Sequence, residues 1–115
     1  MPYTIGEVAR MMNIAPSTLR YYEKEGLLSL GVRASNGQRT YTDDDIATLS
    51  IIEYLKFCGL PLKEIRSFLP LVQPGGETLE ARRAIMAKER DNVLAQIAAL
   101  QTKLERLEFG CWYYE

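Results

Sequence analysis

The stretch that decides the fold is TLRYYEKEGL, residues 18–27. Pro16 lies just upstream and favours the first position of a helix, so the sequence predicts a helix over residues 17–25 that ends at Gly26. The segment TIGE at residues 4–7 has the pattern of a capping box and predicts an earlier helix. A short turn joins the two. Two short helices connected in this way form a helix-turn-helix unit.

Residues 27–41 show no helical periodicity. Within them, Asn36-Gly37 is the strongest sequence signal for a two-residue hairpin turn. Residues 32–33 and 38–41 flank this turn, and we predict that they form two short strands. This hairpin, called the wing below, carries an arginine on each strand.

Thr42 and the three aspartates that follow it predict the start of a third helix. A threonine N-cap and acidic residues in the first turn both stabilise a helix N-terminus. Gly59 is expected to end this helix, and residues 62–71 are predicted to form a fourth. The expected buried residues of these two helices are Ile46, Leu49, Ile52 (or Ile51), Leu55, Phe57, Ile65, Phe68 and Leu69.

The best-ordered apolar pattern follows a Pro-Gly-Gly segment that marks a linker at residues 73–77. Thr78 is expected to cap a helix of about 30 residues, roughly 45 Å long. Its apolar residues recur in steps of three and four, with Arg90 as the single polar insertion, which is a heptad seam. The predicted dimerisation residues on this seam are Met86, Val93, Ile97, Leu100, Leu104 and Leu107.

A helix of this length needs a partner to cover its seam. A second copy of the chain is the simplest partner, and the alternative is a helix that folds back on its own domain. The sequence is thus divided into a winged helix-turn-helix head (residues 1–72), a linker (73–77), a dimerisation helix (78–109) and an aromatic C-terminal tail (110–115).

The composition indicates a globular chain and argues against an enzyme. The 115 residues are 47% hydrophobic and 25% charged, which is typical of an ordinary domain. Histidine is absent, so the commonest general base and metal ligand is missing, and no nucleophile–base pair is visible. We therefore expect no catalytic residue, no metal site and no cofactor.

Positive charge is concentrated in one segment. The net charge is −1, but residues 10–39 contain five basic and two acidic side chains. A local excess of this kind favours contact with phosphates, although a solvated helix face can carry as much. No apolar run is long enough to cross a bilayer, and no leader is visible, so we expect a cytoplasmic protein without a membrane partner.

Three motifs together resemble the MerR family of transcription regulators. They are TLRYYEKEGL at residues 18–27, GQRTY at residues 37–41 and GLPLKEI at residues 59–65. The resemblance extends from residue 3 to about residue 109, and the last part is similar to short members without a separate effector domain. It implies a mostly α protein, with a winged helix-turn-helix head and a long C-terminal dimerisation helix that forms an antiparallel coiled coil.

The second predicted helix is expected to enter the major groove of DNA. Arg20 is the first candidate for a base-edge or bidentate phosphate contact, because its planar guanidinium suits both targets. Tyr21 and Tyr22 are consecutive and cannot both point outward, so a mainly core role for Tyr22 stays open. Lys56 lies where the family places a phosphate-contacting lysine, and a solvated helix residue is the alternative. The predicted DNA-binding residues are Ser17, Thr18, Arg20, Tyr21, Tyr22, Arg33, Arg39, Tyr41 and Lys56.

The resemblance also implies a mechanism. Two heads of a homodimer bind the halves of a pseudo-palindromic operator in a promoter whose spacer is too long for RNA polymerase. Distortion of that spacer then realigns the promoter elements, and the deformation energy is offset by extra protein contacts. The effector is unknown.

Four residues are candidates for an effector or redox role: Cys58, Cys111, Trp112 and Tyr113. Metal-sensing relatives carry a second cysteine after the one near Cys111, and this sequence has none there. Thiol-responsive relatives carry a cysteine at the position of Tyr54, whereas Cys58 here is better explained as an inert core residue than as a thiol switch. The aromatic tail either lines a small-molecule pocket or caps the end of the coiled coil.

Two other functions stay open. One is an architectural, excisionase-like protein that bends DNA, although such proteins usually lack a long dimerisation helix. The other is a coiled-coil adaptor that binds a protein partner and has lost DNA binding.

Overall fold

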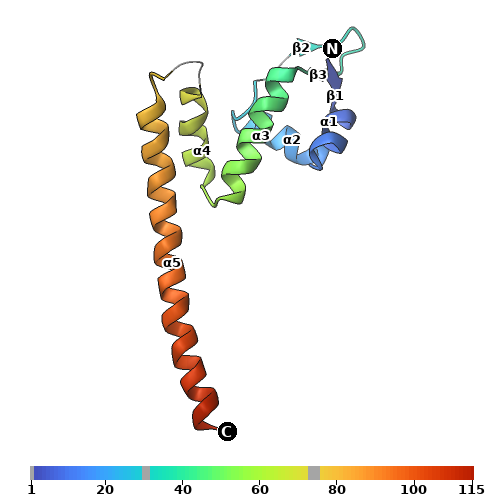
Figure 1. Ribbon diagram of the computed structural model, residues 1–115. Coiled ribbons are helices and arrows are strands. Elements are labelled where there is room, and N and C mark those ends of the chain that lie inside the picture. Colours follow the sequence, from blue (N-terminus) through green and yellow to red (C-terminus); the bar gives the residue numbers. More distant parts are fainter. Residues whose placement is uncertain (1, 30–31, 73–75) are drawn as a thin grey trace. The chain divides into compact units, whose positions relative to one another are not determined.

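The computed structural model describes residues 2–29, 32–72 and 76–115 (Figure 1). It divides into two compact units, Met1–Gln73 and Pro74–Glu115. The first unit corresponds to the predicted head and the second contains the long helix. Three residues of the predicted linker, Gln73, Pro74 and Gly75, lie outside the described residues.

The helix-turn-helix is formed by α1 (Ile5–Met12) and α2 (Pro16–Lys24). Thr4 caps α1 as predicted: its hydroxyl accepts a hydrogen bond from the backbone N–H of Glu7, and the Glu7 carboxylate accepts one from the backbone of Thr4. Asn13 ends α1 in the left-handed region, at φ 53°. Pro16 starts α2 as predicted, and Ala15 supplies no side-chain cap.

A three-stranded antiparallel sheet lies beside these helices, in the order β1-β3-β2. The strands are β1 (Tyr3–Thr4), β2 (Val32–Arg33) and β3 (Arg39–Tyr41). The two wing strands are those that the sequence predicts. Strand β1 was not predicted, because two residues are too few to show an alternating pattern; it pairs Tyr3 with Tyr41.

The wing turn differs from the predicted two-residue hairpin. The N–H of Ala34 bonds to the carbonyl of Gln38, and the N–H of Gly37 bonds to the carbonyl of Ala34, which leaves a three-residue loop. Gly37 has φ 85°, whereas Asn36 does not adopt a positive φ. Asn36 instead accepts a hydrogen bond from the N–H of Gln38 through its side chain. A glycine at the left-handed position of a three-residue loop is a common hairpin solution.

Helix α3 (Asp43–Phe57) is followed by α4 (Leu62–Phe68) and the short 3-10 helix η1 (Leu69–Leu71). Gly59 makes the turn between α3 and α4 at φ 94°, as expected. The predicted burial of Phe57 is wrong, since its side chain is 91% exposed. Leu55 is fully buried, and a residue two positions further along a helix points to the opposite side.

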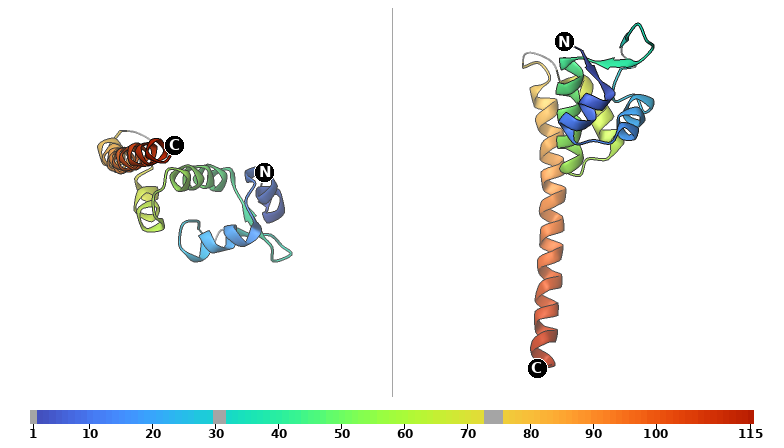
Figure 2. Two further views of the ribbon diagram at one scale, coloured as in Figure 1. Left: turned by 90° about the horizontal axis from the view of Figure 1, so that it is seen from below. Right: turned by 90° about the vertical axis from the view of Figure 1, so that its right-hand side faces the viewer.

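The buried side chains of the head come mainly from α1, α2, α3, α4 and β3, whose ribbons are drawn in Figure 2. The predicted residues Leu49, Ile52 and Leu55 contribute the α3 face, and Ile65 and Phe68 contribute that of α4. Leu69 is only half-buried and belongs to η1, so the predicted fourth helix is shorter than residues 62–71. The largest fully buried side chains are Tyr22, Tyr41, Leu19, Leu49, Ile52, Leu55, Ile65 and Val8.

The capping box at the start of α3 can be tested by replacing Thr42. Its hydroxyl accepts a hydrogen bond from the N–H of Asp45, and the Asp45 carboxylate accepts one from the N–H of Thr42. We expect Thr42→Ala to lower the free energy of unfolding by about 1 kcal/mol. Urea unfolding checks this, with Thr42→Ser as the control that keeps the hydroxyl. An equal loss in both variants would contradict the cap.

The second unit contains one continuous helix, α5 (Leu79–Tyr113), of 35 residues. It is roughly 52 Å long and extends beyond the predicted end at residue 109, so most of the expected tail is helical. Thr78 occupies the N-cap position, but its hydroxyl accepts a hydrogen bond from Arg82 rather than capping the backbone. Within the described residues, no helix is long and apolar enough to cross a membrane.

Candidate nucleic-acid interface

Helix α2 has one buried face and one polar exposed face. Leu19 and Tyr22 are buried at 0% and 1% exposure. Ser17, Arg20 and Tyr21 lie on the other side and are exposed. A short helix with this division presents side chains of base-reading and phosphate-binding chemistry to the outside.

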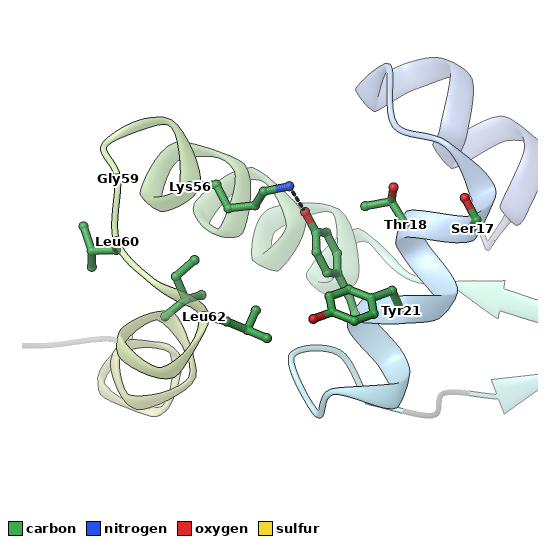
Figure 3. Close-up of a pocket in the computed structure, with 9 residues that line it drawn as sticks. Ser17, Thr18, Tyr21, Lys56, Gly59, Leu60 and Leu62 are labelled. Atoms are coloured by element: carbon green, nitrogen blue, oxygen red, sulfur yellow. Dashed lines mark hydrogen bonds between the residues drawn. The ribbon is translucent and has the colours of Figure 1, made fainter.

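A groove of about 630 Å³ runs beside α2, toward the turn that joins α3 and α4 (Figure 3). One side carries the hydroxyl groups of Ser17, Thr18 and Tyr21 from α2, and Lys56 of α3 lies across from them. The remaining lining residues are Tyr22, Gly59, Leu60, Leu62 and Ile65. The groove therefore combines a cationic and hydroxyl-rich rim with an aliphatic wall.

Lys56 is held in this groove by Tyr22. Its Nζ donates a hydrogen bond of 2.7 Å to the Tyr22 hydroxyl, which donates one of 3.2 Å to Glu53. The hydrogen bond to Tyr22 raises the pKa of Lys56, so the ammonium group stays charged. Burial raises the pKa of Tyr22, so its hydroxyl stays protonated. Tyr22 is thus a core residue whose hydroxyl reaches the groove and orients a cation there.

The two arginines of the wing differ in environment. Arg33 on β2 is exposed, and its guanidinium donates a hydrogen bond of 2.9 Å to the carbonyl of Gly37. Arg39 on β3 is only 9% exposed. Its guanidinium lies 3.4 Å from Glu23 and 3.3 Å from Asp45, and it also bonds to the carbonyls of Ser29 and Thr40.

Tyr41 is also internal. Its ring is fully buried, lies 3.9 Å from the Arg39 guanidinium carbon, and its hydroxyl donates a hydrogen bond of 2.5 Å to Glu23. Burial, followed by the contact with Glu23, raises its pKa well above the ordinary value.

The burial of Arg39 and Tyr41 favours internal roles over the predicted DNA contacts, because the two side chains offer almost no exposed surface. Residues two apart on a strand share a face, and Tyr41 is the more apolar of this pair. The alternation of side chains along a strand therefore indicates that Arg39 and Tyr41 point inward together. The positive charge of Arg39 instead favoured the prediction of a DNA contact.

The effector candidates belong to two different helices, α3 and α5. Cys58 is half-buried at the end of α3, and Cys111 is exposed on α5. Trp112 and Tyr113 both contact the ring of Phe109, with ring centroids 5.7 and 6.2 Å apart. Among the described residues, no group of three or more His, Cys, Asp or Glu side chains could hold a metal ion.

The seam of α5 is largely uncovered in the single chain. Met86 is half-buried, and the other five predicted dimerisation residues have exposures from 37% to 61%. Such a row of exposed aliphatic side chains is unusual for a monomer. The exposed seam residues are Val93, Ile97, Leu100, Leu104 and Leu107.

Comparison with known proteins identifies the family. Residues 3–71 match the MerR HTH family regulatory proteins, and residues 46–108 match the family described as MerR, DNA binding. The chain belongs to the MerR family. MerR proteins are DNA-binding transcriptional regulators and not enzymes, so the family, the class of function and the absence of enzymatic activity agree with the sequence prediction. The predicted helix-turn-helix fold with a long C-terminal helix is likewise confirmed.

Individual MerR relatives align over almost the whole chain. An uncharacterized HTH-type transcriptional regulator of Haemophilus influenzae is 37% identical, over 100% of this chain and 85% of its own length. The regulator ZntR of Escherichia coli is 35% identical, over 95% of this chain and 80% of its own. The crystal structure of HiNmlR, a MerR family regulator lacking the sensor domain and bound to promoter DNA, superimposes with a TM-score of 0.69. It is 38% identical and covers 99% of this chain and 90% of its own.

Proposed function

We propose that this MerR protein binds a pseudo-palindromic promoter operator as a homodimer and activates transcription by distorting the promoter spacer. The observation that carries the proposal is the exposed face of α2 beside the Lys56 groove. The promoter complex of HiNmlR supports it, because that protein resembles this one along nearly its whole length. A cytoplasmic location, where promoter DNA is found, belongs to the same proposal.

In this proposal, α2 reads the major groove. Ser17 and Thr18 lie near its N-terminus, which is the end of a recognition helix that enters the groove first. Arg20 is exposed, and its guanidinium can donate two hydrogen bonds to a guanine edge. Tyr21, which is 49% exposed, has a hydroxyl suited to a backbone phosphate.

The groove beside α2 would receive the sugar–phosphate backbone. Lys56 supplies a charged donor that Tyr22 already orients, and Thr18 and Tyr21 supply hydroxyl groups. Leu60 and Leu62 form an apolar wall suited to a deoxyribose. Arg33 on the exposed part of the wing is the second cation for a phosphate.

Replacement of Arg20 and replacement of Lys56 should reduce DNA affinity in different ways. We expect Arg20→Ala to weaken operator binding by about tenfold to a hundredfold and to leave binding to an unrelated duplex nearly unchanged. Lys56→Ala should weaken binding to both duplexes by a similar factor and lower the salt dependence by about one phosphate contact. Fluorescence anisotropy at several salt concentrations measures both.

Lys24→Ala is the control for loss of positive charge from α2, since Lys24 is exposed in its last turn. If Arg20→Ala and Lys24→Ala have the same small effect on operator and unrelated DNA, α2 does not read the sequence.

Activation requires its own experiment, because an architectural protein would bind and bend DNA without it. Run-off transcription with RNA polymerase should increase on the native promoter when the protein is added. It should not increase on a promoter whose spacer has been shortened to the optimal length for polymerase, since distortion is then no longer needed. Binding without any gain in transcription would favour the architectural function, and partner binding without DNA binding would favour the adaptor.

A further inference from the structure

A buried ionic cluster connects the wing to the recognition helix. Its centre is the Arg39 guanidinium of β3, which contacts Glu23 of α2 and Asp45 of α3. Tyr41 lies next to it on β3 and donates its hydroxyl to Glu23. The side chains of Arg39, Glu23 and Asp45 are 8%, 14% and 13% exposed, so all three charges are largely withdrawn from solvent.

The cluster adds side-chain contacts to a sheet that has few backbone hydrogen bonds. Strand β3 pairs with each neighbour through only two residue positions, which gives few backbone hydrogen bonds. Glu23 lies in the last turn of the same helix that carries Arg20, and Asp45 forms the capping box of α3. A guanidinium has donors in fixed directions, so contacts to two carboxylates define its orientation as well as its position.

We propose that Glu23, Arg39 and Tyr41 are positioning residues for DNA binding, which set the place of the wing relative to α2. The proposal rests on the proposed function, because it assumes that α2 and the exposed Arg33 of the wing contact one DNA duplex. Two DNA-contacting elements bind most strongly when their spacing is fixed before binding. The cluster supplies this spacing and does not itself touch DNA.

A positioning role and a direct phosphate contact predict different changes in DNA affinity for Glu23→Gln. Glu23→Gln removes a negative charge and leaves Arg39 with Asp45 as its one charged partner in the cluster. If Arg39 contacted phosphate, this change would leave DNA affinity unchanged or raise it, since less negative charge opposes the duplex. If the cluster positions the wing, the same change lowers the affinity, because the wing is no longer held in place.

The test compares Glu23→Gln with Glu25→Gln in the full chain on a promoter duplex. Glu25 is the matched control, because it lies in the same region, carries the same charge and forms a more exposed ion pair, 3.8 Å from Arg66. We expect Glu23→Gln to lower the affinity about tenfold relative to Glu25→Gln. Binding is measured at a temperature at which thermal unfolding followed by circular dichroism shows both variants to be folded.

A second readout separates positioning from a general loss of stability. Arg33→Ala should weaken binding several-fold in the otherwise unchanged chain and by less than about twofold when Glu23→Gln is also present. Such coupling shows that the wing contact depends on the cluster. Tyr41→Phe, which removes one hydroxyl and keeps the ring against Arg39, should show the same coupling with a smaller loss.

The outcomes are distinct. Reduced affinity of Glu23→Gln with coupling to Arg33 supports the proposal. Affinity equal to or above that of Glu25→Gln, or strictly additive effects with Arg33→Ala, overturns it. If the unchanged chain fails to bind promoter DNA at all, the proposed function itself has failed.

Discussion

Leu104→Glu is expected to convert the proposed homodimer into a monomer and to lower the affinity for the promoter operator at least about a hundredfold. Leu104 lies in the C-terminal half of the α5 seam and is 55% exposed in the single chain. A glutamate there would be buried without a partner charge in each copy of a paired helix. A monomer binds only one half-site, so the gain from linking two heads is lost.

Sedimentation equilibrium measures the dissociation of the dimer, and anisotropy measures the affinity. The matched control is Thr102→Glu, which adds the same charge on the opposite side of the heptad repeat, where the side chain is exposed. We expect this control to remain dimeric and to bind DNA almost as the unchanged chain does. A Leu104→Glu protein that stays dimeric would contradict the proposed role of the seam.

Arg39→Ala is expected to lower the free energy of unfolding of the head by about 3–5 kcal/mol. The change leaves Glu23 and Asp45 as largely buried carboxylates without their shared cation. It also removes the guanidinium from the Tyr41 ring and the hydrogen bond to the carbonyl of Ser29. Such a loss is large for a domain of this size.

Amide hydrogen exchange of the buried part of α3 reports this stability without interference from unfolding of α5. The control is Arg33→Ala, because Arg33 pairs with Arg39 across the wing and is exposed. We expect the control to cost less than about 1 kcal/mol. Losses of equal size for the two arginines would mean that the ionic cluster contributes little.

The helix boundaries of the head were largely predictable, because their signals are local. Thr4 forms the expected capping box, Thr42 is the expected N-cap, and Gly26 and Gly59 adopt positive φ values where their helices end. Caps and glycine turns depend on a few neighbouring residues, so one sequence is enough to recognise them.

The predictions from sequence were wrong or incomplete for features that depend on residues distant along the chain. Phe57 fits an apolar pattern but lies outside the face that packs on the core. The two-residue strand β1 exists only because β3 lies beside it. Likewise, the excess of basic residues between Arg10 and Arg39 overstates the free positive charge, since Arg39 is paired with Asp45, which lies beyond that segment.

The candidate DNA-binding site has one feature that local sequence predicts and one that depends on distant residues. The exposed face of α2 follows from helical periodicity, which already separates Leu19 and Tyr22 from Arg20. The groove around Lys56 depends on how the tertiary fold places α2 relative to the α3–α4 turn, which no local sequence pattern contains. The roles of Cys58, Cys111, Trp112 and Tyr113 stay predictions.

The most direct test of promoter-specific binding is fluorescence anisotropy of the purified protein on a labelled duplex from its own upstream promoter. Salt is varied, and an unrelated duplex serves as competitor. We predict saturation at one dimer per pseudo-palindrome, a clear preference over the competitor and a steep fall in affinity with salt. Equal, weak binding to both duplexes, or no binding at low salt, would contradict the conclusion that this protein is a promoter-specific regulator.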